Sequence, residues 1–365
     1  MIISDIAKAG TSIWLDDLSR AKLTGTDALS LPSRIKKSGV VGVTTNPSIF
    51  NSAITGSADY AADIALMKSE SPENIVKKLT TDDVRNACDL FTEIYSQSGG
   101  VDGRVSIEVD PRLAHATQET INEGKSLWAL VNRPNLMIKV PATIAGLPAI
   151  TELIASGISV NVTLIFSCKR YEQVIDAFIT GVEEATKRGN DVSQIHSVAS
   201  FFISRIDTAV DKELKSIDTA ESIGLLGKAA IANAVLAYEL FLNKSASARW
   251  KKLREAGAHM QRPLWASTGV KDPSYDDTRY VMELIAPHTV NTMPQSTLDA
   301  VIDHAKFHGN TVTPSIEKSH LVMAQLIKVG VSLNSITDVL ETEGVAAFSK
   351  AWQALLDDVD KVRSA

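Results

Sequence analysis

Eight short runs rich in β-branched and apolar residues recur along the 365-residue chain, and longer helical segments separate them. This alternation is typical of parallel β-α units, and eight such units are enough to close a barrel. An open doubly wound sheet would alternate in the same way, but no glycine-rich dinucleotide-binding segment follows the first run. We therefore expect one domain over residues 1–365, an α/β fold of the (β/α)8 TIM-barrel type. The expected strands are residues 12–17, 39–46, 104–109, 136–141, 158–166, 196–204, 262–268 and 288–293.

Helices additional to those of a simple barrel are also expected. The segments between the second and third runs and between the sixth and seventh exceed the length of one crossover helix. Ser71, followed by Pro72, predicts a helix start in the first of these segments. After the eighth run the chain continues through two or three more helices, and we hypothesise that "FSKAWQALL" (348–356) folds over the barrel mouth and limits the entry of water.

Composition and charge narrow the possible partners. The 43 acidic residues outnumber the 37 basic ones, giving a net charge of −6, which argues against nucleic acid or an anionic membrane as partner. The most apolar window (229–242) contains Asn233 and Glu239 and indicates a packed helix rather than a membrane span. Cys88 and Cys168 stand far apart and predict two thiols rather than a disulfide or metal site. With no signal peptide visible, we expect a cytoplasmic protein, as a monomer or homodimer.

A lysine interrupts the apolar run "LMIKVP" (136–141). Side chains alternate along a strand, so Ile138 and Val140 are expected to face the covering helices and Lys139 the barrel interior. Burial disfavours the charged form of an amine, and a neutral amine can attack a carbonyl carbon to form a Schiff base. The alternative is a lysine at a strand end that reaches solvent.

Other strands also carry polar residues where they end, at the face where barrel enzymes have their active sites. Single polar residues in strands are usually caps or edge residues, but several strands delivering them to one end predict a site. We do not expect a metal there. His304 and His308 are four residues apart but lack a third ligand, so an exposed helix face is favoured. The candidate residues are Asp16, Asn46, Glu108, Asn161, Thr163, Ser200, Phe202 and Arg205.

Two long segments, "GVTTNPSIF" (42–50) and "LMIKVPATIAGLPAITEL" (136–153), resemble the signature segments of the transaldolases. The resemblance extends through "VSIEVDPRL", "VNVTLIFS" and "ASFFISRID", and "LWASTGVKDPSYDDTRYV" is similar to the longer bacterial and actinobacterial type. It implies a transferase of the pentose phosphate pathway that moves a dihydroxyacetone unit between sugar phosphates. The donor would be sedoheptulose 7-phosphate or fructose 6-phosphate, the acceptor glyceraldehyde 3-phosphate or erythrose 4-phosphate, and no cofactor would be needed.

The resemblance also implies roles for the catalytic residues. Lys139 matches the Schiff-base lysine, and Asp16 matches the base that removes the C4 hydroxyl proton during cleavage. Glu108 matches the acid/base that works through a water molecule, and Thr163 would orient that water. Two carboxylates in different surroundings can divide such proton transfers.

Substrate-binding roles follow in the same way. Asn46, Asn161 and Ser200 would hold the hydroxyls of the three-carbon fragment, and Phe202 would line the site. Arg205 matches a phosphate-binding arginine. A second family arginine has no match here, and Ser267 and Lys271 are available in its place; a lysine supplies a point charge rather than a two-pronged contact.

Two other functions are weighed against this one. The first is an aldolase on the same fold, which would release dihydroxyacetone to water. Relatives of that type carry glutamine where Glu108 stands and tyrosine where Phe202 stands, so both positions favour the transferase. The second is an inactive barrel that serves as a binding scaffold, and the presence of Asp16, Glu108 and Lys139 argues against it.

Overall fold

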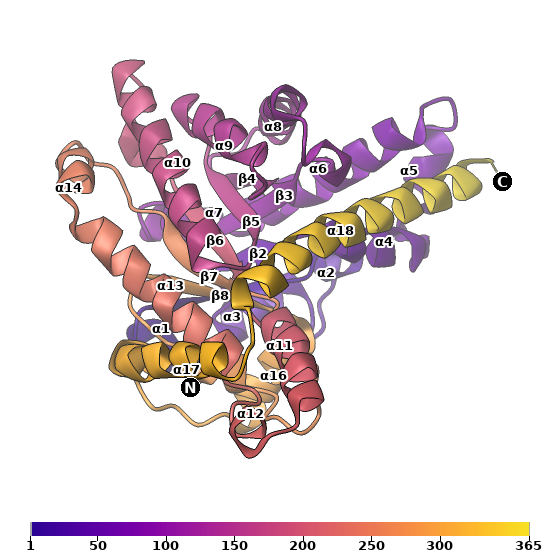
Figure 1. Ribbon diagram of the computed structural model, residues 1–365. Helices are drawn as coiled ribbons and strands as arrows, with labels where there is room; N and C mark the ends of the chain where they lie inside the picture. The colour runs from indigo at the N-terminus through magenta and orange to yellow at the C-terminus, as the bar shows by residue number, and fades with distance from the viewer. Residues whose placement is uncertain (1, 365) are drawn as a thin grey trace.

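The computed structural model describes residues 2–364, and in it all eight expected strands form (Figure 1). Each strand pairs in parallel with the next, and β1 pairs with β8, so the sheet is a closed barrel. The predicted (β/α)8 fold is therefore confirmed, while the organisation into one domain stays a prediction. The strands are β1 (Thr11–Asp16), β2 (Gly42–Thr44), β3 (Arg104–Glu108), β4 (Leu136–Pro141), β5 (Val160–Ile165), β6 (Ser197–Phe202), β7 (Arg262–Ala266) and β8 (Thr289–Met293).

The largest difference from the expected strand bounds concerns residues 39–46, of which only 42–44 form β2. Gly39 ends the preceding helix in the left-handed conformation, with φ 65°. At the other end Asn46 begins the next helix, its side chain accepting a hydrogen bond from the backbone N–H of Ile49. Two helix caps therefore shorten this strand from both sides.

Helices surround the barrel and include more than one per crossover. The α-helices are α1 (Ile2–Lys8), α2 (Arg20–Thr24), α3 (Leu31–Ser38), α4 (Pro47–Thr55), α5 (Ala61–Leu66), α6 (Pro72–Leu90), α7 (Thr92–Gln97), α8 (Thr117–Val131), α9 (Gly146–Ala155), α10 (Cys168–Lys187), α11 (Ser204–Ile217), α12 (Ala220–Ile223), α13 (Ala229–Ala246), α14 (Ala248–Glu255), α15 (Arg279–Met282), α16 (Gln295–His304), α17 (Ile316–Lys328) and α18 (Leu333–Ser364). Short 3-10 helices are η1 (Ala58–Tyr60), η2 (Pro111–Leu113), η3 (Val192–Gln194) and η4 (Thr313–Ser315). The predicted start of α6 is confirmed, because the Ser71 side chain accepts from the N–H of Asn74. Among the helices of residues 2–364, none combines the length and apolar character that crossing a membrane requires.

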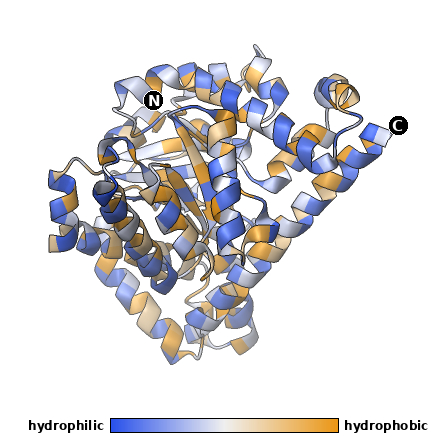
Figure 2. Ribbon diagram, turned by 90° about the horizontal axis from the view of Figure 1, so that it is seen from above, coloured by the Kyte–Doolittle hydropathy of each residue, from blue (hydrophilic) through white to orange (hydrophobic). Residues whose placement is uncertain are grey.

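The barrel interior is packed below its mouth. The strands are mostly apolar (Figure 2). Trp14 is fully buried, and a Cβ atom on Gly42 would lie 2.6 Å from its indole ring, so only glycine fits beside it. At the opposite end from the mouth, Arg262 pairs with Asp102 at 3.1 Å, and Asp102 accepts from the hydroxyl of Ser12. Side chains thus fill the cylinder from one end to the level of Asp16, two residues beyond Trp14 on the same face of β1.

The long helix α18 follows β8 and α17 and passes across the molecule (Figure 1). It packs against α4, α6 and α11, and therefore spans several of the units that surround the barrel. A Cβ atom on Gly344 would lie 3.0 Å from a methyl group of Leu164, which directly follows the mouth residue Thr163 of β5. The close approach of α18 to β5 supports the hypothesis that residues 348–356 cover the barrel mouth.

Candidate active site

A pocket of about 200 Å³ opens at the carboxyl ends of the strands. Nine of the eleven predicted site residues line it, and the other two, Glu108 and Asn161, contact lining residues directly. The structure therefore brings the predicted set together at one place. The nine residues are Asp16, Asn46, Lys139, Thr163, Ser200, Phe202, Arg205, Ser267 and Lys271.

Lys139 points into the barrel mouth, as strand alternation predicts. Its side chain is only 6% exposed, and its Nζ donates a 3.0 Å hydrogen bond to the backbone carbonyl of Thr45. Parallel pairing places Glu108 of β3 and Asn161 of β5 at the same level on either side of it. The Nζ lies 3.2 Å from Oε2 of Glu108. A buried amine and a buried carboxyl therefore share one position in the barrel.

The Glu108 carboxyl has unused hydrogen-bonding capacity. Although Lys139 is within ion-pair distance, neither Oε1 nor Oε2 has an aligned hydrogen-bond donor among the described residues. The hydroxyl of Thr163 is likewise buried without a partner there. Desolvation by burial raises the pKa of Glu108 to about 7, against the opposing charge of Lys139. A carboxyl that is half protonated near neutral pH can accept a proton from the amine beside it and return it.

Asp16 stands on β1, opposite this pair, at the pocket wall. The hydroxyl of Thr44 donates to its Oδ1 at 2.6 Å, and Thr44 in turn is 2.7 Å from the hydroxyl of Thr292. Burial raises the pKa of Asp16, while the charge of Lys139 and the Thr44 hydrogen bond oppose the rise. The two threonines hold the carboxylate in place through Oδ1, and no hydrogen bond to Oδ2 is found among the described residues.

Both polar atoms of the Asn161 amide hydrogen-bond to neighbouring side chains. Its Nδ2 donates to the Ser106 hydroxyl at 3.0 Å, and its Oδ1 accepts from the Ser200 hydroxyl at 2.7 Å. Asn161 is fully buried and does not itself line the pocket, whereas Ser200 does. Ser200 therefore borders the pocket directly, and Asn161 holds the Ser200 hydroxyl in place.

Cationic groups gather at the β6 and β7 side of the pocket. Arg205 lies in the first turn of α11, has no ion-pair partner among the described residues, and stacks over Phe202 at 5.3 Å. Burial lowers its pKa from the ordinary value, but an arginine remains charged at neutral pH. Ser267 adopts φ 55°, in the left-handed region, and its hydroxyl is 3.0 Å from that of Ser204. Exposed Lys271 completes a region suited to an anion.

Sequence reasoning missed several residues of the pocket. Thr44 stands two residues before Asn46 and shares its strand face, so the alternation of side chains along the strand also predicts that Thr44 faces the pocket. Thr292 follows from the same argument on β8. Phe348 of α18 also lines the pocket, with its ring 5.6 Å from Nζ of Lys139. The sequence predicted that residues 348–356 cover the barrel mouth, but it did not single out Phe348, because no local pattern links this residue to a strand end.

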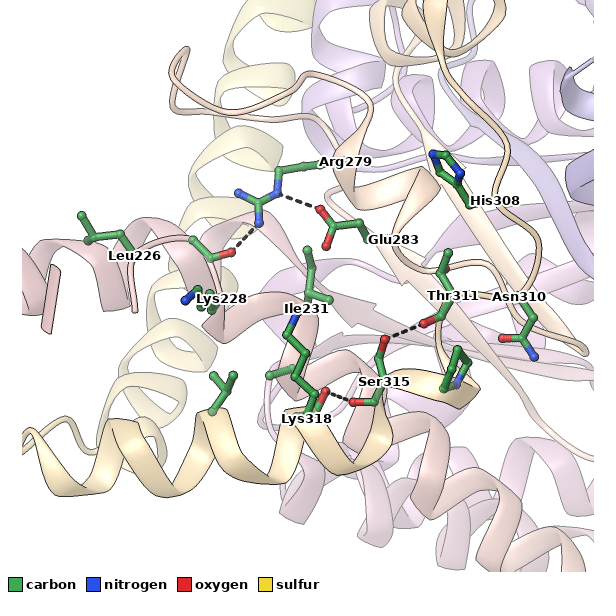
Figure 3. A pocket seen from close by; sticks show the side chains of 15 residues that line it. Leu226, Lys228, Ile231, Arg279, Glu283, His308, Asn310, Thr311, Ser315 and Lys318 are labelled. Atoms are coloured by element: carbon green, nitrogen blue, oxygen red, sulfur yellow. Dashed lines mark hydrogen bonds and ion pairs between the residues drawn. The ribbon is translucent and has the colours of Figure 1, made fainter. Parts of the chain in front are cut away.

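A larger pocket, of about 570 Å³, lies elsewhere (Figure 3). It is outside the barrel, between α13, α15 and α17, and contains none of the predicted residues. Arg279 there pairs with Glu283 and donates to the carbonyl of Gly227, so its charge has partners. Within residues 2–364, no group of three histidine, cysteine, aspartate or glutamate side chains could hold a metal ion, and His304 pairs with Asp277 instead.

Residues 13–359 match the protein family described as Transaldolase/Fructose-6-phosphate aldolase. A transaldolase of Mycolicibacterium smegmatis is 52% identical over 358 residues, covering 97% of this chain and 95% of that protein. A transaldolase of Renibacterium salmoninarum is 53% identical over 365 residues, covering 99% and 97%. One of Arthrobacter sp. (strain FB24) is 53% identical over 358 residues, covering 97% and 95%. The likeness therefore spans both the barrel and most of α18.

The raised pKa of the buried Glu108 carboxyl predicts a pH-dependent loss of stability. The folded-state pKa of Glu108, about 7, is above its ordinary value of 4.5. The folded protein therefore binds more protons than the unfolded chain between these pH values, and stability falls as pH rises through them. Lys139→Met removes the charge that holds this pKa down, so the loss should continue to higher pH. We expect the fall in unfolding free energy from about pH 5 to about pH 8 to exceed that of the wild type by about 1–2 kcal/mol.

Denaturant titrations of both proteins at the two pH values measure this difference. The control is the double variant Lys139→Met/Glu108→Gln, in which no carboxyl titrates at this position and the extra fall should vanish. An equal pH dependence in the single and double variants would show that Glu108 is not the group that Lys139 influences.

Proposed function

The chain belongs to the transaldolase/fructose-6-phosphate aldolase family and is an enzyme of the transaldolase type. From that premise we propose that it transfers a dihydroxyacetone unit from sedoheptulose 7-phosphate or fructose 6-phosphate to glyceraldehyde 3-phosphate or erythrose 4-phosphate, through a Schiff base on Lys139. The observation that carries the proposal is the burial of the Lys139 amine 3.2 Å from Glu108, at the 200 Å³ pocket described above, which we call the mouth pocket.

Imine formation requires the amine in its neutral form. Glu108 accepts a proton from Nζ, which then attacks the C2 carbonyl carbon of the ketose phosphate. The carbinolamine loses its hydroxyl as water when a proton is delivered to it. Among residues 2–364, neither the Glu108 oxygens nor the Thr163 hydroxyl has an aligned hydrogen bond. This supports a water-mediated transfer, with Glu108 as acid/base and Thr163 as the group that orients the water.

Cleavage of the C3–C4 bond follows from the protonated imine, which accepts the electron pair. Asp16 removes the proton of the C4 hydroxyl as the bond breaks, and the aldose phosphate leaves. The enamine that remains on Lys139 attacks the aldehyde carbon of the acceptor, and Asp16 returns the proton to the new hydroxyl. Hydrolysis of the second imine releases the product and restores the amine.

Substrate positioning divides between the two sides of the pocket. Asn46 and Ser200, with Asn161 behind Ser200, hold the hydroxyls of the three-carbon fragment. Arg205, Ser267 and Lys271 receive the phosphate, near the N-terminus of α11, where backbone N–H groups favour an anion. Phe202 forms the apolar wall between these two sides.

The enamine must meet an aldehyde before water protonates it. The ring of Phe348 stands over Lys139 and closes the pocket from the α18 side, which supports transfer rather than release to water. An aldolase would not need to keep water from the enamine, because it releases dihydroxyacetone to water. We expect a cytoplasmic enzyme whose partners are sugar phosphates. The net charge of −6 argues against a nucleic-acid partner.

Borohydride reduction tests the central step. With fructose 6-phosphate present, reduction should attach the three-carbon unit stably to one lysine, and peptide mapping should find it on Lys139. Lys139→Met should show neither the adduct nor turnover, because no amine remains at this position. An adduct on another lysine, or turnover in Lys139→Met, would contradict the proposed mechanism.

Lys271→Ala tests the phosphate position. Loss of one cation facing the phosphate should raise KM for phosphorylated substrates by roughly fivefold to tenfold while leaving KM for unphosphorylated sugars nearly unchanged. Lys215→Ala is the matched control, because this lysine is exposed, pairs with Asp272 and lies outside the mouth pocket. An equal effect of Lys271→Ala on both substrate types would remove its proposed role.

Phe348→Ala tests the covering function of α18. Without the ring, water reaches the enamine, and release of dihydroxyacetone from fructose 6-phosphate without acceptor should rise roughly tenfold relative to transfer. Val339→Ala, on an exposed position of the same helix, controls for a general effect on α18. If release in Phe348→Ala stays at the wild-type level, this ring does not exclude water. Rapid release by the wild type itself would favour the aldolase.

A further inference from the structure

A second, much smaller cavity adjoins Glu108, which does not line the mouth pocket. Its walls come from α4, α6, α8, β3 and α18, and the Glu108 and Trp352 side chains both line it. Asn46 lines both this cavity and the mouth pocket, and therefore stands between them. We call this space the Trp352 cavity. Nothing in the proposed reaction uses it.

The size of the Trp352 cavity fits one water molecule. The centre of a water molecule can occupy about 10 Å³ there, close to the smallest space that holds a single one. A buried water also needs polar partners. Nε1 of Trp352 is buried without a hydrogen-bond partner among residues 2–364, and so are both carboxyl oxygens of Glu108. The cavity is thus bordered by a donor and an acceptor that each lack an aligned hydrogen bond within the described residues, although Glu108 also lies within ion-pair distance of Lys139.

The chemistry of the two groups fixes the direction of a bridge. An indole N–H can only donate, so a water between the two groups accepts from Trp352 and donates to Glu108 when that carboxyl is ionised. We propose that Trp352 is a positioning residue for Glu108, acting through one water molecule held in the Trp352 cavity. The proposal rests on the acid/base role given to Glu108 above, and deepens it by naming the group that tunes this carboxyl.

The charged groups around Glu108 leave room for such an effect. Lys139 of β4 and Asp16 of β1 act on it from the mouth pocket. Lys77 of α6 and Glu123 of α8 border the Trp352 cavity, and they pair with each other at 2.9 Å, so their charges largely cancel. The wall residues from α4 are uncharged. Trp352 therefore supplies a hydrogen-bond donor on a side of the carboxyl where no net charge stands.

Trp352→Phe keeps an aromatic ring and removes the N–H. A carboxylate that loses a donated hydrogen bond is protonated more readily. The acidic limb of the pH profile of kcat should therefore move to higher pH by about half a unit to one unit. KM for the sugar phosphate should remain nearly unchanged, because Trp352 does not line the mouth pocket.

Phe50→Leu is the matched control, since Phe50 lines the same cavity from α4 but offers no donor. We expect this variant to lose stability without moving the acidic limb. Equal shifts in Phe50→Leu and Trp352→Phe would mean that packing alone is responsible, and would overturn the proposal. A limb that stays at the wild-type pH in Trp352→Phe would overturn it as well.

Glu108→Gln separates this proposal from the proposed function. If Glu108→Gln retains wild-type turnover, the acid/base role fails, and the tuning role of Trp352 fails with it. If Glu108→Gln loses turnover while the Trp352→Phe limb does not move, only the water bridge is wrong. A crystal structure of the wild type gives an answer that needs no variant to fold. We expect one water within hydrogen-bond distance of both Nε1 of Trp352 and a Glu108 oxygen, and a dry cavity would contradict the proposal.

Discussion

An amine and a carboxyl enclosed together at the mouth of a barrel are the constraint on which the rest of this structure depends. Removing Lys139 and Glu108 from water costs free energy, and their mutual attraction recovers only part of it. The closed barrel makes the arrangement possible, because backbone pairing of β3 and β4 places the two residues at the same level. The enclosure also explains how the amine can react. A protonated amine cannot attack a carbonyl carbon, and the Glu108 carboxyl that can accept its proton lies 3.2 Å away.

Two unrelated parts of the chain produce the enclosure. The strands surround the pair from below, with Trp14 filling the barrel beneath Asp16. From above, α18 places two aromatic residues four positions apart, and therefore on one helix face. Phe348 stands over Lys139, and Trp352 borders the cavity beside Glu108. One helix thus reaches both members of the pair, which explains why a segment far from the strands in sequence belongs to the site.

Much of the fold and of the site could be predicted from the sequence. The same physical rules also show which features could not be. Period-two alternation places side chains such as Lys139 and Ser200 on the inner face, and parallel strands bring them to one end. Alternation cannot say which inner side chains bond to one another, so it did not show that the Asn161 amide is held between Ser106 and Ser200. It also cannot place Phe348, because contact between a late helix and a strand end depends on the packing of the whole chain. The length of β2 depended on caps at Gly39 and Asn46, which strand propensity does not register.

All eight strands precede α18 in the chain, so the closed sheet and the helix that covers it come from separate parts of the sequence. A barrel whose strands had paired before α18 docked would leave Lys139 open to any small aldehyde or ketone, because Phe348 would not yet stand over the amine. Docking of α18 would end this exposure and restrict which molecules reach the lysine.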